Sequence, residues 1–373
     1  MEYLILIAVC VGLVAYAERK AQMNTHLFWG IVVVSLLISS IFSGIRSFDT
    51  GYDIKTYVLY HFEYAKSANV VQYVRQYGSD SILYSIMICA VAKFFSDAHW
   101  MLFFIQLYIN AFFYIAAYRY KYYTKKKMWV FLLVYYCVFY IYTFNIMRQG
   151  MAISMIMLAC IELIYGRKYK LYFVMLALAT LMHPTSILAL GIPAVVIALQ
   201  QKKRSAVTIA APVFIILLTV VFILGFREIM QVLLSVGIVK DRYSYAISSL
   251  YKSRYNIETY KVAFCLLNLL LAFKLKDLEN KTIKGVVIVS LSISLAAYMI
   301  GGVSTSLERI GLYYWVPSLC ILSGYIYDRI RVSIGKTEIF KYIYMISMLG
   351  MCVYQFFVCD QAAAYPYVFM WEA

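Results

Sequence analysis

The feature that most limits the fold of this chain is a series of strongly apolar runs, each about 17–22 residues long, that recurs along most of its length. A helix of about 20 apolar residues is long enough to cross a bilayer. Only 14% of the residues are charged, against about 25% in a typical soluble domain. The sequence therefore predicts an all-α polytopic membrane protein with about 12–14 transmembrane or re-entrant helices.

The runs predict one integral membrane domain over residues 1–373, with no soluble domain and no internal repeat. Residues 46–79 form a mixed polar segment, for which we expect short helices lying at the membrane interface. Residues 226–258 are expected to form a long outer loop. The spans are expected at about 3–17, 27–45, 80–95, 98–118, 128–144, 149–165, 171–188, 187–199, 206–225, 259–273, 285–301, 311–328 and 340–358.

The net charge of +16 would indicate a nucleic-acid partner in a soluble protein. Here most of the excess lies in short loops, the most basic at 118–127, as the positive-inside rule predicts for cytoplasmic loops. Counting spans from that loop places Arg148, His183, Arg309 and the 226–258 loop on the non-cytoplasmic face. For residues 1–118 three alternatives stay open: the 46–79 segment crosses or half-crosses, one span within 80–118 is re-entrant, or the first two spans are inverted.

No pattern in the sequence predicts a metal or a cofactor. The eight cysteines stand singly, nearly all within apolar runs, which is typical of membrane packing. There is no H-x-x-x-H pair, no carboxylate cluster with ligand spacing, no Walker loop and no Rossmann glycine pattern. We therefore expect no metal, no cofactor and no nucleotide.

Residues 145–149 carry the most unusual polar cluster, because Asn145, Arg148 and Gln149 lie between two apolar runs. A charge at membrane depth costs ~2.5–3.5 kcal/mol on insertion scales and marks a side chain that faces a cavity or a partner. An arginine that snorkels from a helix end to the headgroups is the simpler alternative. The accompanying Asn and Gln favour a binding site.

Three further elements carry polar groups at span ends. Each has a structural alternative. For Arg46 and Asp53 it is a snorkelling arginine beside a turn-forming Asp, and for His183 a hydrogen-bonded His near a helix end. For Glu308 and Arg309 it is an ion pair that each makes elsewhere in the protein. One arginine guanidinium can bind two phosphate oxygens at once, and a carboxylate or imidazole can accept a proton from an attacking hydroxyl. The three elements are Arg46 with Asp53 and Tyr57, His183 with Ser186, and Glu308 with Arg309 and Tyr313.

The order of these motifs resembles that of the EpsG-like branch of the Wzy-type polysaccharide polymerases. The pattern departs from the family in Tyr52, where the usual form is Gly-Thr-Asp, and in Pro184 directly after His183. The residues that carry the resemblance are Arg46, Gly51–Asp53 and Tyr57; Asn145, Arg148, Gln149 and Ala152; Ala179, His183 and Ser186; Glu308, Arg309, Tyr313 and Tyr314; and Pro366, Tyr367 and Phe369.

The resemblance implies a metal-independent glycosyltransferase of the bacterial plasma membrane, loosely GT-C-like, with an outer cavity. Its donor and acceptor would be oligosaccharides linked to undecaprenyl pyrophosphate. A chain-length regulator and other polysaccharide-assembly proteins are further expected partners. Arg148 and Arg309, assisted by Arg46, would hold the donor pyrophosphate, while Asp53 or His183 would act as the base. The remaining substrate-binding candidates are Asn145, Gln149, Tyr57, Ser186, Glu308 and Tyr313.

Two other classes of protein fit the same sequence features. A flippase for a lipid-linked sugar would also use broken helices and membrane-embedded arginines, although transporters are often built from repeats that this chain lacks. An O-antigen-ligase-like transferase would share the arginines and the long outer loop, and an acyltransferase would depend on His183.

Overall fold

The computed structural model describes residues 1–20, 25–51, 53–78, 80–200, 259–275, 281–301, 305–329, 333–334 and 337–372, with a few isolated positions between 210 and 235. The described chain is helical apart from turns and a hairpin of two short strands, β1 (Ser333–Ile334) and β2 (Thr337–Glu338), which pair antiparallel. The span expected over 206–225 and the outer loop expected over 226–258 lie, but for those isolated positions, outside the described residues.

The chain divides into two compact units, Met1–Leu190 with Leu319–Ala373 and Gly191–Ser318. The prediction of a single membrane domain stays a prediction. Helix α16 (Thr305–Arg329) contributes to both units. The first unit also holds α1 (Glu2–Lys20), α2 (Thr25–Gly44), η1 (Ile54–Leu59), α3 (Tyr60–Ser67), α4 (Val70–Tyr73), η2 (Val74–Gly78), α5 (Ile82–Phe94), α6 (His99–Thr124), α7 (Met128–Tyr135), η3 (Tyr136–Tyr140), η4 (Ile141–Phe144), α8 (Met147–Ile164), α9 (Tyr169–Met182), η5 (Pro184–Leu190), α17 (Ile339–Val353) and η7 (Tyr354–Val358); the second also holds α10 (Gly191–Gln200), α14 (Thr259–Lys274) and α15 (Lys281–Gly301).

The prediction of an all-α polytopic membrane protein is confirmed. Within the described part of the chain, α2, α6, α8 and α15 are long and apolar enough to cross a membrane. Shorter apolar helical stretches lie at Ile82–Phe94, Met128–Phe144, Tyr169–Met182, Pro184–Gln200 and Tyr342–Val358. Many of these positions coincide with expected spans.

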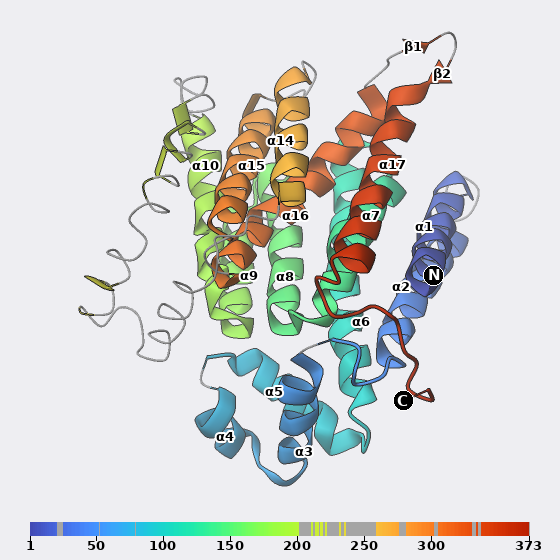
Figure 1. Cartoon of the computed structure of the whole chain (residues 1–373), viewed down its shortest axis with the longest axis vertical. Helices are drawn as coiled ribbons and strands as arrows, with labels where there is room; N and C mark the ends of the chain where they lie inside the picture. Colours follow the sequence, from blue (N-terminus) through green and yellow to red (C-terminus); the bar gives the residue numbers. More distant parts are fainter. Residues whose placement is uncertain are drawn as a thin grey trace. The chain divides into compact units, whose positions relative to one another are not determined.

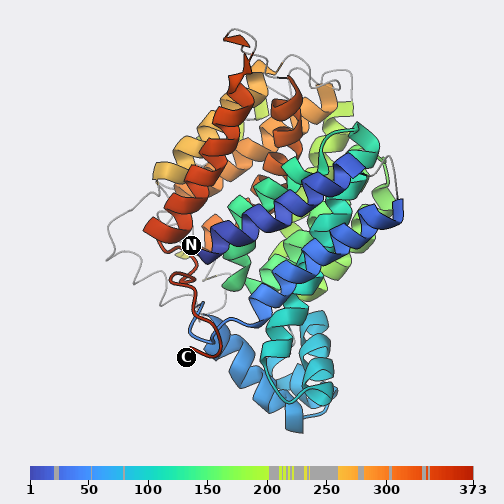
Figure 2. The ribbon, with the colours of Figure 1, turned by 90° about the vertical axis from the view of Figure 1, so that its right-hand side faces the viewer.

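In the first unit, α2 and α6 run side by side in opposite directions, and two contacts fix their ends (Figure 2). The ring of Phe48, just after α2, stacks on His99 at the start of α6, with ring centroids 4.0 Å apart. At the other end Lys121 forms a 3.0 Å ion pair with Glu18, just before the α1–α2 connection. The chain therefore leaves α2 and enters α6 at the same end of the unit.

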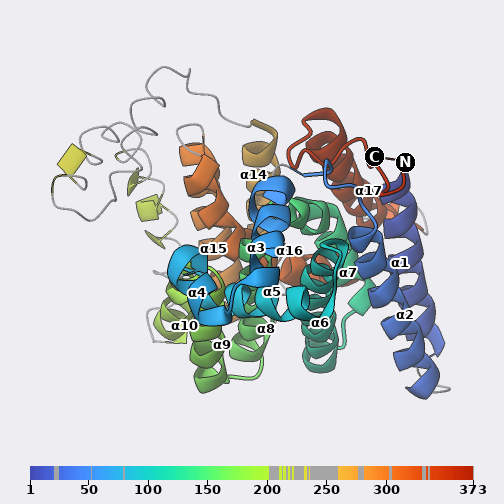
Figure 3. The ribbon, with the colours of Figure 1, turned by 90° about the horizontal axis from the view of Figure 1, so that it is seen from below.

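Residues 54–94 form a layer of short helices at that end, here called the helical cap, which lies below the lower ends of α8 and α9 and beside the lower end of α6 (Figures 1 and 3). The expected interfacial helices of the 46–79 segment are η1, α3, α4 and η2. The span expected over 80–95 is α5, whose 13 residues extend only about 20 Å, against about 30 Å of hydrocarbon. Helix α5 packs on α3 and η2 instead of crossing.

Of the three alternatives for residues 1–118, this arrangement favours the second, in which one span within 80–118 is re-entrant, and that span is α5. Helices α1, α2 and α6 run the length of the unit, and the whole of 46–98 stays at one end. We call this the cap end and the opposite one the basic end.

A buried polar network holds α2, α6 and the α7–η3–η4 helix together between the two ends. Asn110 on α6 donates to the hydroxyls of Ser39 and Ser40 on α2, at 2.9 Å each. The same amide accepts from Tyr135, and Gln106 one turn earlier accepts from Thr143 at 3.0 Å. Hydrogen bonds between helices replace the hydrophobic force that lipid cannot supply, so this network fixes how the three helices pack.

The basic end is organised around Glu162 near the end of α8, whose side chain is almost completely buried. Its carboxylate accepts from Arg119, from Lys168 at 2.8 Å and from the Tyr123 hydroxyl at 3.0 Å. Lys126 forms a further ion pair at 3.0 Å with Asp328. The basic loops at 118–127 and 167–170 thus meet at this end, as the positive-inside rule predicts for a cytoplasmic face.

The last described residues return to the cap end beside the first turn of α1. The backbone N–H of Ser47 donates to the carbonyl of Val368 at 2.8 Å, and that of Met370 donates to Ile45, also at 2.8 Å. The Tyr3 hydroxyl donates to the carbonyl of Ala364 at 2.6 Å. Residues 359–372 therefore close over the end of α2.

In the second unit, α14, α15 and the first part of α16 pack around Trp315. Its ring makes edge-on contacts with Phe264 and Tyr298. The hydroxyl of Ser294 donates to the carbonyl of Gly311, where an added Cβ would lie 2.8 Å from Ala297, so α15 and α16 approach closely.

Candidate functional site

The polar turn predicted at 145–149 is shorter in the structure: only Asn145 and Ile146 separate two helices, and residues 147–149 form the start of the second. The helix that starts at Met128 changes to a π-turn at Tyr136–Tyr140 and a 3-10 turn at Ile141–Phe144, and α8 then begins at Met147. Residue Ile146 supplies no side-chain cap to α8. Arg148 thus lies in the first turn of a long helix, where the helix dipole adds partial positive charge to that of the guanidinium.

The Arg148 guanidinium faces aromatic rings of the helical cap. Its central carbon lies 5.2 Å from the ring centre of Tyr57 and 5.8 Å from that of Tyr84. The side chain is half-buried, and within the described residues it makes no hydrogen bond and no ion pair. A charge held this way has its hydrogen-bond donors available to an anion.

A narrow cavity, here called the Arg148 cavity, lies beside this group. Its volume is about 10 Å³, enough for about one water molecule. Its walls are almost entirely hydroxyl-bearing or aromatic. The lining residues are Tyr57, His61, Tyr73, Tyr77, Ser81, Tyr84, Ser85 and Arg148.

His61 is the titratable group of this wall, on the first turn of α3. Its Nδ1 lies 2.9 Å from the hydroxyl of Tyr73, and its ring meets that of Tyr77 edge-on at 5.0 Å. Burial, and after it the charge of Arg148, lowers the pKa of His61. The ring therefore favours its neutral form, which can accept a proton.

Arg46 lies just beyond the end of α2, only 1% exposed. Its guanidinium donates to the hydroxyl of Ser43, approaches the sulfur of Met147 at 3.9 Å and lies 3.9 Å from the ring centre of Phe144. Its Nε has no hydrogen-bond partner, and no carboxylate pairs with it among the described residues. Burial lowers the pKa of Arg46 to about 10.

Gly51 brings the turn after Arg46 against the Asn145 turn. Its φ of +118° suits glycine, and an added Cβ would lie 3.0 Å from the carbonyl oxygen of Phe144. In the same two turns, Thr50 Oγ1 and Asn145 Oδ1 are buried without a hydrogen-bond partner within the described structure. A polar ligand between these turns would satisfy such atoms.

Asp53 begins the cap directly before η1 and is half-buried. Its charge acts on Tyr84, which lines the Arg148 cavity. From the predicted set, the structure therefore brings Tyr57 to Arg148 and places Asp53 directly before the helix that carries Tyr57.

His183 ends α9, with its backbone N–H still bonded to Ala179. Its Nδ1 lies 2.8 Å from the hydroxyl of Thr185. Ser186 is buried and donates to the carbonyls of Ala179 and His183, so it closes the helix end that Pro184 interrupts. His183 is not among the residues that line the Arg148 cavity.

Glu308, Arg309 and Tyr313 lie on the part of α16 that belongs to the second unit. Glu308 forms a buried ion pair with Lys261 of α14. Arg309 is half-buried and Tyr313 is fully buried. The prediction that Arg309 shares one site with Arg148 stays a prediction, as does a binding role for Gln149.

Several residues of this arrangement were not predicted as site residues: His61, Tyr73, Tyr77 and Tyr84 around Arg148, and Lys261 beside Glu308. A sequence signal exists for the first three, because Tyr57 and His61, and again Tyr73 and Tyr77, are spaced by four and so share a helix face. In the described part of the chain, no group of three or more His, Cys, Asp and Glu side chains is placed to hold a metal ion.

The fold and the site define a polytopic helical membrane protein with a cationic, tyrosine-lined site at one end. A family model, described as the EpsG family, matches residues 28–369, which is nearly the whole chain. The chain belongs to the EpsG family, and its membership indicates a membrane enzyme of the glycosyltransferase type, acting in polysaccharide polymerisation on lipid-linked saccharides. The comparisons with curated proteins and with solved structures find no match.

Proposed function

We propose that this protein joins oligosaccharide units carried on undecaprenyl pyrophosphate into a polysaccharide at the outer face of the bacterial plasma membrane. The observation that carries the proposal is Arg148, whose charge faces a cavity without a protein anion among the described residues. The site lies at the cap end, away from the basic loops, so the positive-inside rule assigns it to the outer face.

The pyrophosphate of the donor would bind at Arg148 and the first turn of α8. A guanidinium fork matches phosphate oxygens, and the helix N-terminus adds partial positive charge. Arg46 would assist from the neighbouring turn. Donors held ready for the charge that develops on the leaving group lower the barrier of the transfer.

In the reaction, an acceptor hydroxyl attacks the anomeric carbon of the donor sugar. A C–O bond forms to the acceptor oxygen, and the C–O bond to the lipid pyrophosphate breaks with its electron pair on the pyrophosphate. The hydroxyl proton passes to Asp53 or His183. Of the two, Asp53 directly precedes η1, which carries Tyr57 of the cavity wall, and this position favours it as the base.

The test is polymerisation by purified protein in lipid discs, supplied with lipid-linked repeat units and read as product chain length. Arg148→Lys keeps a positive charge but loses the fork, so we expect activity to fall by at least about 100-fold. Lys170→Gln, at an exposed cation near the basic end, is the matched control. Normal chain length in Arg148→Lys would remove the pyrophosphate assignment.

The base is identified by the same assay with Asp53→Asn and His183→Ala. Activity retained in one variant excludes that residue from the role. A flippase is distinguished in a deletion strain, because loss of a polymerase leaves single repeat units on lipid outside the membrane, whereas loss of a flippase leaves them inside.

A further inference from the structure

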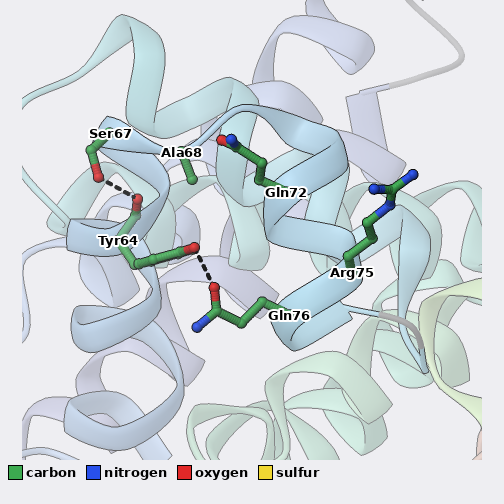
Figure 4. A pocket seen from close by; sticks show the side chains of 6 residues that line it. All are labelled: Tyr64, Ser67, Ala68, Gln72, Arg75 and Gln76. Atoms are coloured by element: carbon green, nitrogen blue, oxygen red, sulfur yellow. Dashed lines mark hydrogen bonds between the residues drawn. The ribbon is translucent and has the colours of Figure 1, made fainter.

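A second concave site lies on the helical cap and is lined by residues other than those of the Arg148 cavity (Figure 4). We call it the cap groove. Its volume of about 560 Å³ lies within the range of small-molecule sites. The lining residues are Tyr64, Ser67 and Ala68 from α3 and the turn after it, and Gln72, Arg75 and Gln76 from α4 and η2.

The chemistry of the cap groove suits a sugar. Two amide side chains, two hydroxyls and a tyrosine ring line it, and its one charged lining residue is Arg75. Figure 4 shows the Tyr64 hydroxyl meeting Gln76 across the groove. Amides and hydroxyls bind sugar hydroxyls, and an aromatic face covers the apolar side of a pyranose ring.

Arg75 is exposed, and among the described residues it makes no hydrogen bond or ion pair. Its five N–H donors are therefore available to a ligand, either to hydroxyls or to an acidic substituent. The neighbouring cation, Lys66, is instead paired with Glu63.

The walls of the cap groove and of the Arg148 cavity contact each other through their side chains. The Tyr64 ring in the groove meets the Tyr77 ring of the cavity edge-on, with centroids 4.9 Å apart. Gln76 Nε2 donates to the Tyr77 hydroxyl at 3.1 Å, and that hydroxyl lies 3.1 Å from the Tyr60 hydroxyl. A ligand that extends from Arg148 over Tyr77 would thus enter the groove.

We infer that the cap groove binds the saccharide portion of the lipid-linked substrate or product, at a distance from the pyrophosphate. This inference rests on the proposed function and adds a glycan subsite to it. The subsite would retain the sugar chain between additions and so raise the number of units joined.

The test measures binding of lipid-free oligosaccharides of one and two repeat units, prepared by partial hydrolysis of the polysaccharide of the same strain, to the full protein in lipid discs. Arg75→Gln removes donors without breaking an internal contact, and we expect about tenfold weaker binding. Ser67→Trp fills the groove from an exposed position and should abolish binding. Arg148→Lys and the control Lys170→Gln should bind as the wild type does.

Wild-type binding in both groove variants, or no binding by the wild-type protein, would overturn the inference. Chain length separates it from the proposed function: the groove variants should still join units but give shorter products, whereas Arg148→Lys should join none. Polymerisation by Arg148→Lys with loss of oligosaccharide binding in the groove variants would reject the pyrophosphate assignment and keep the subsite.

Discussion

Two arginines at the cap end have opposite surroundings. Arg46 is enclosed by Ser43, Met147 and Phe144, whereas Arg148 is half-buried beside a cavity. Arg148 is therefore placed to meet a ligand directly, and in the proposed function Arg46 would act on that ligand from its enclosed position. The tyrosines and His61 around Arg148 supply a polar wall without a competing carboxylate among the lining residues.

Gly51→Ala tests whether the contact between the two turns is needed. Alanine is strained at a φ of +118° and its Cβ would press on the Phe144 carbonyl, so we expect a loss of about 1–3 kcal/mol in stability and reduced polymerisation. Gly12→Ala in α1, where an added Cβ meets nothing within 4 Å, is the control and should unfold at or above the wild-type temperature. Thermal unfolding in detergent measures both, and equal melting temperatures would contradict the prediction.

The lowered pKa of His61 predicts that the stability of the protein depends on pH. Its pKa is lowered in the folded protein, so the unfolded chain takes up a proton first as the pH falls. The contribution of neutral His61 to the free energy of unfolding is therefore present above the unfolded pKa of about 6.5. It is lost as the pH falls through the lowered pKa of the folded protein. Between about pH 7.5 and about pH 5, the melting temperature of His61→Gln should therefore fall less than that of the wild type. The variant His26→Gln, at an exposed position of α2, should follow the wild type.

Among the elements, α5 is the one on which the topology of the first third of the chain depends. A hydropathy pattern describes α5 and α6 in the same way, as apolar runs, and the sequence left the crossing of residues 46–118 open. What separates them is length together with two long-range contacts, Phe48 with His99 and Glu18 with Lys121. Contacts between distant residues carry no local signature, so this part could not be read from the sequence.

Cysteine labelling tests the placement of α5. The exposed Ser67 before α5 and Ser96 after it lie at the same end, so Ser67→Cys and Ser96→Cys should both react with a membrane-impermeant thiol reagent added outside spheroplasts. Lys127→Cys, at the basic end, should react only after lysis. Cys359→Ser provides the background, because Cys359 is the exposed cysteine among those described. Labelling of Ser67→Cys and Ser96→Cys from opposite sides would show that α5 crosses.

Much of the helical framework was predictable, and less of the site was. The runs at 128–144 and 149–165 became the helices Met128–Phe144 and Met147–Ile164, because apolar length alone specifies a membrane helix. Arg148 was found because a charge between such runs is costly. Apart from Tyr57, the cavity wall was not predicted, because tyrosines are abundant throughout this chain and only the folding of the cap brings Tyr73 and Tyr77 to Arg148.

For the whole molecule, the Glu162 cluster ties the two basic loops of the first unit to one end. Glu162→Gln removes the charge that compensates Arg119 and Lys168, which are partly exposed, and we expect stability to fall by about 1–3 kcal/mol. Glu63→Gln, in an exposed pair with Lys66, should cost less than about 1 kcal/mol. Thermal unfolding of the two variants checks this, and an equal effect would show that the buried cluster adds no stability.

The return of residues 359–372 to the end of α2 has a consequence for how the protein is made. The Tyr367 hydroxyl donates to the carbonyl of Phe42, 325 positions earlier in the chain, and Phe369 pairs with Arg46 across a β-bridge. During synthesis, α2 enters the membrane long before the ribosome has made these partners. The contacts around Arg46 are therefore complete only after residues 367–370 have been synthesised, so a chain that stalls or stops before them leaves a charged group of the candidate site less enclosed.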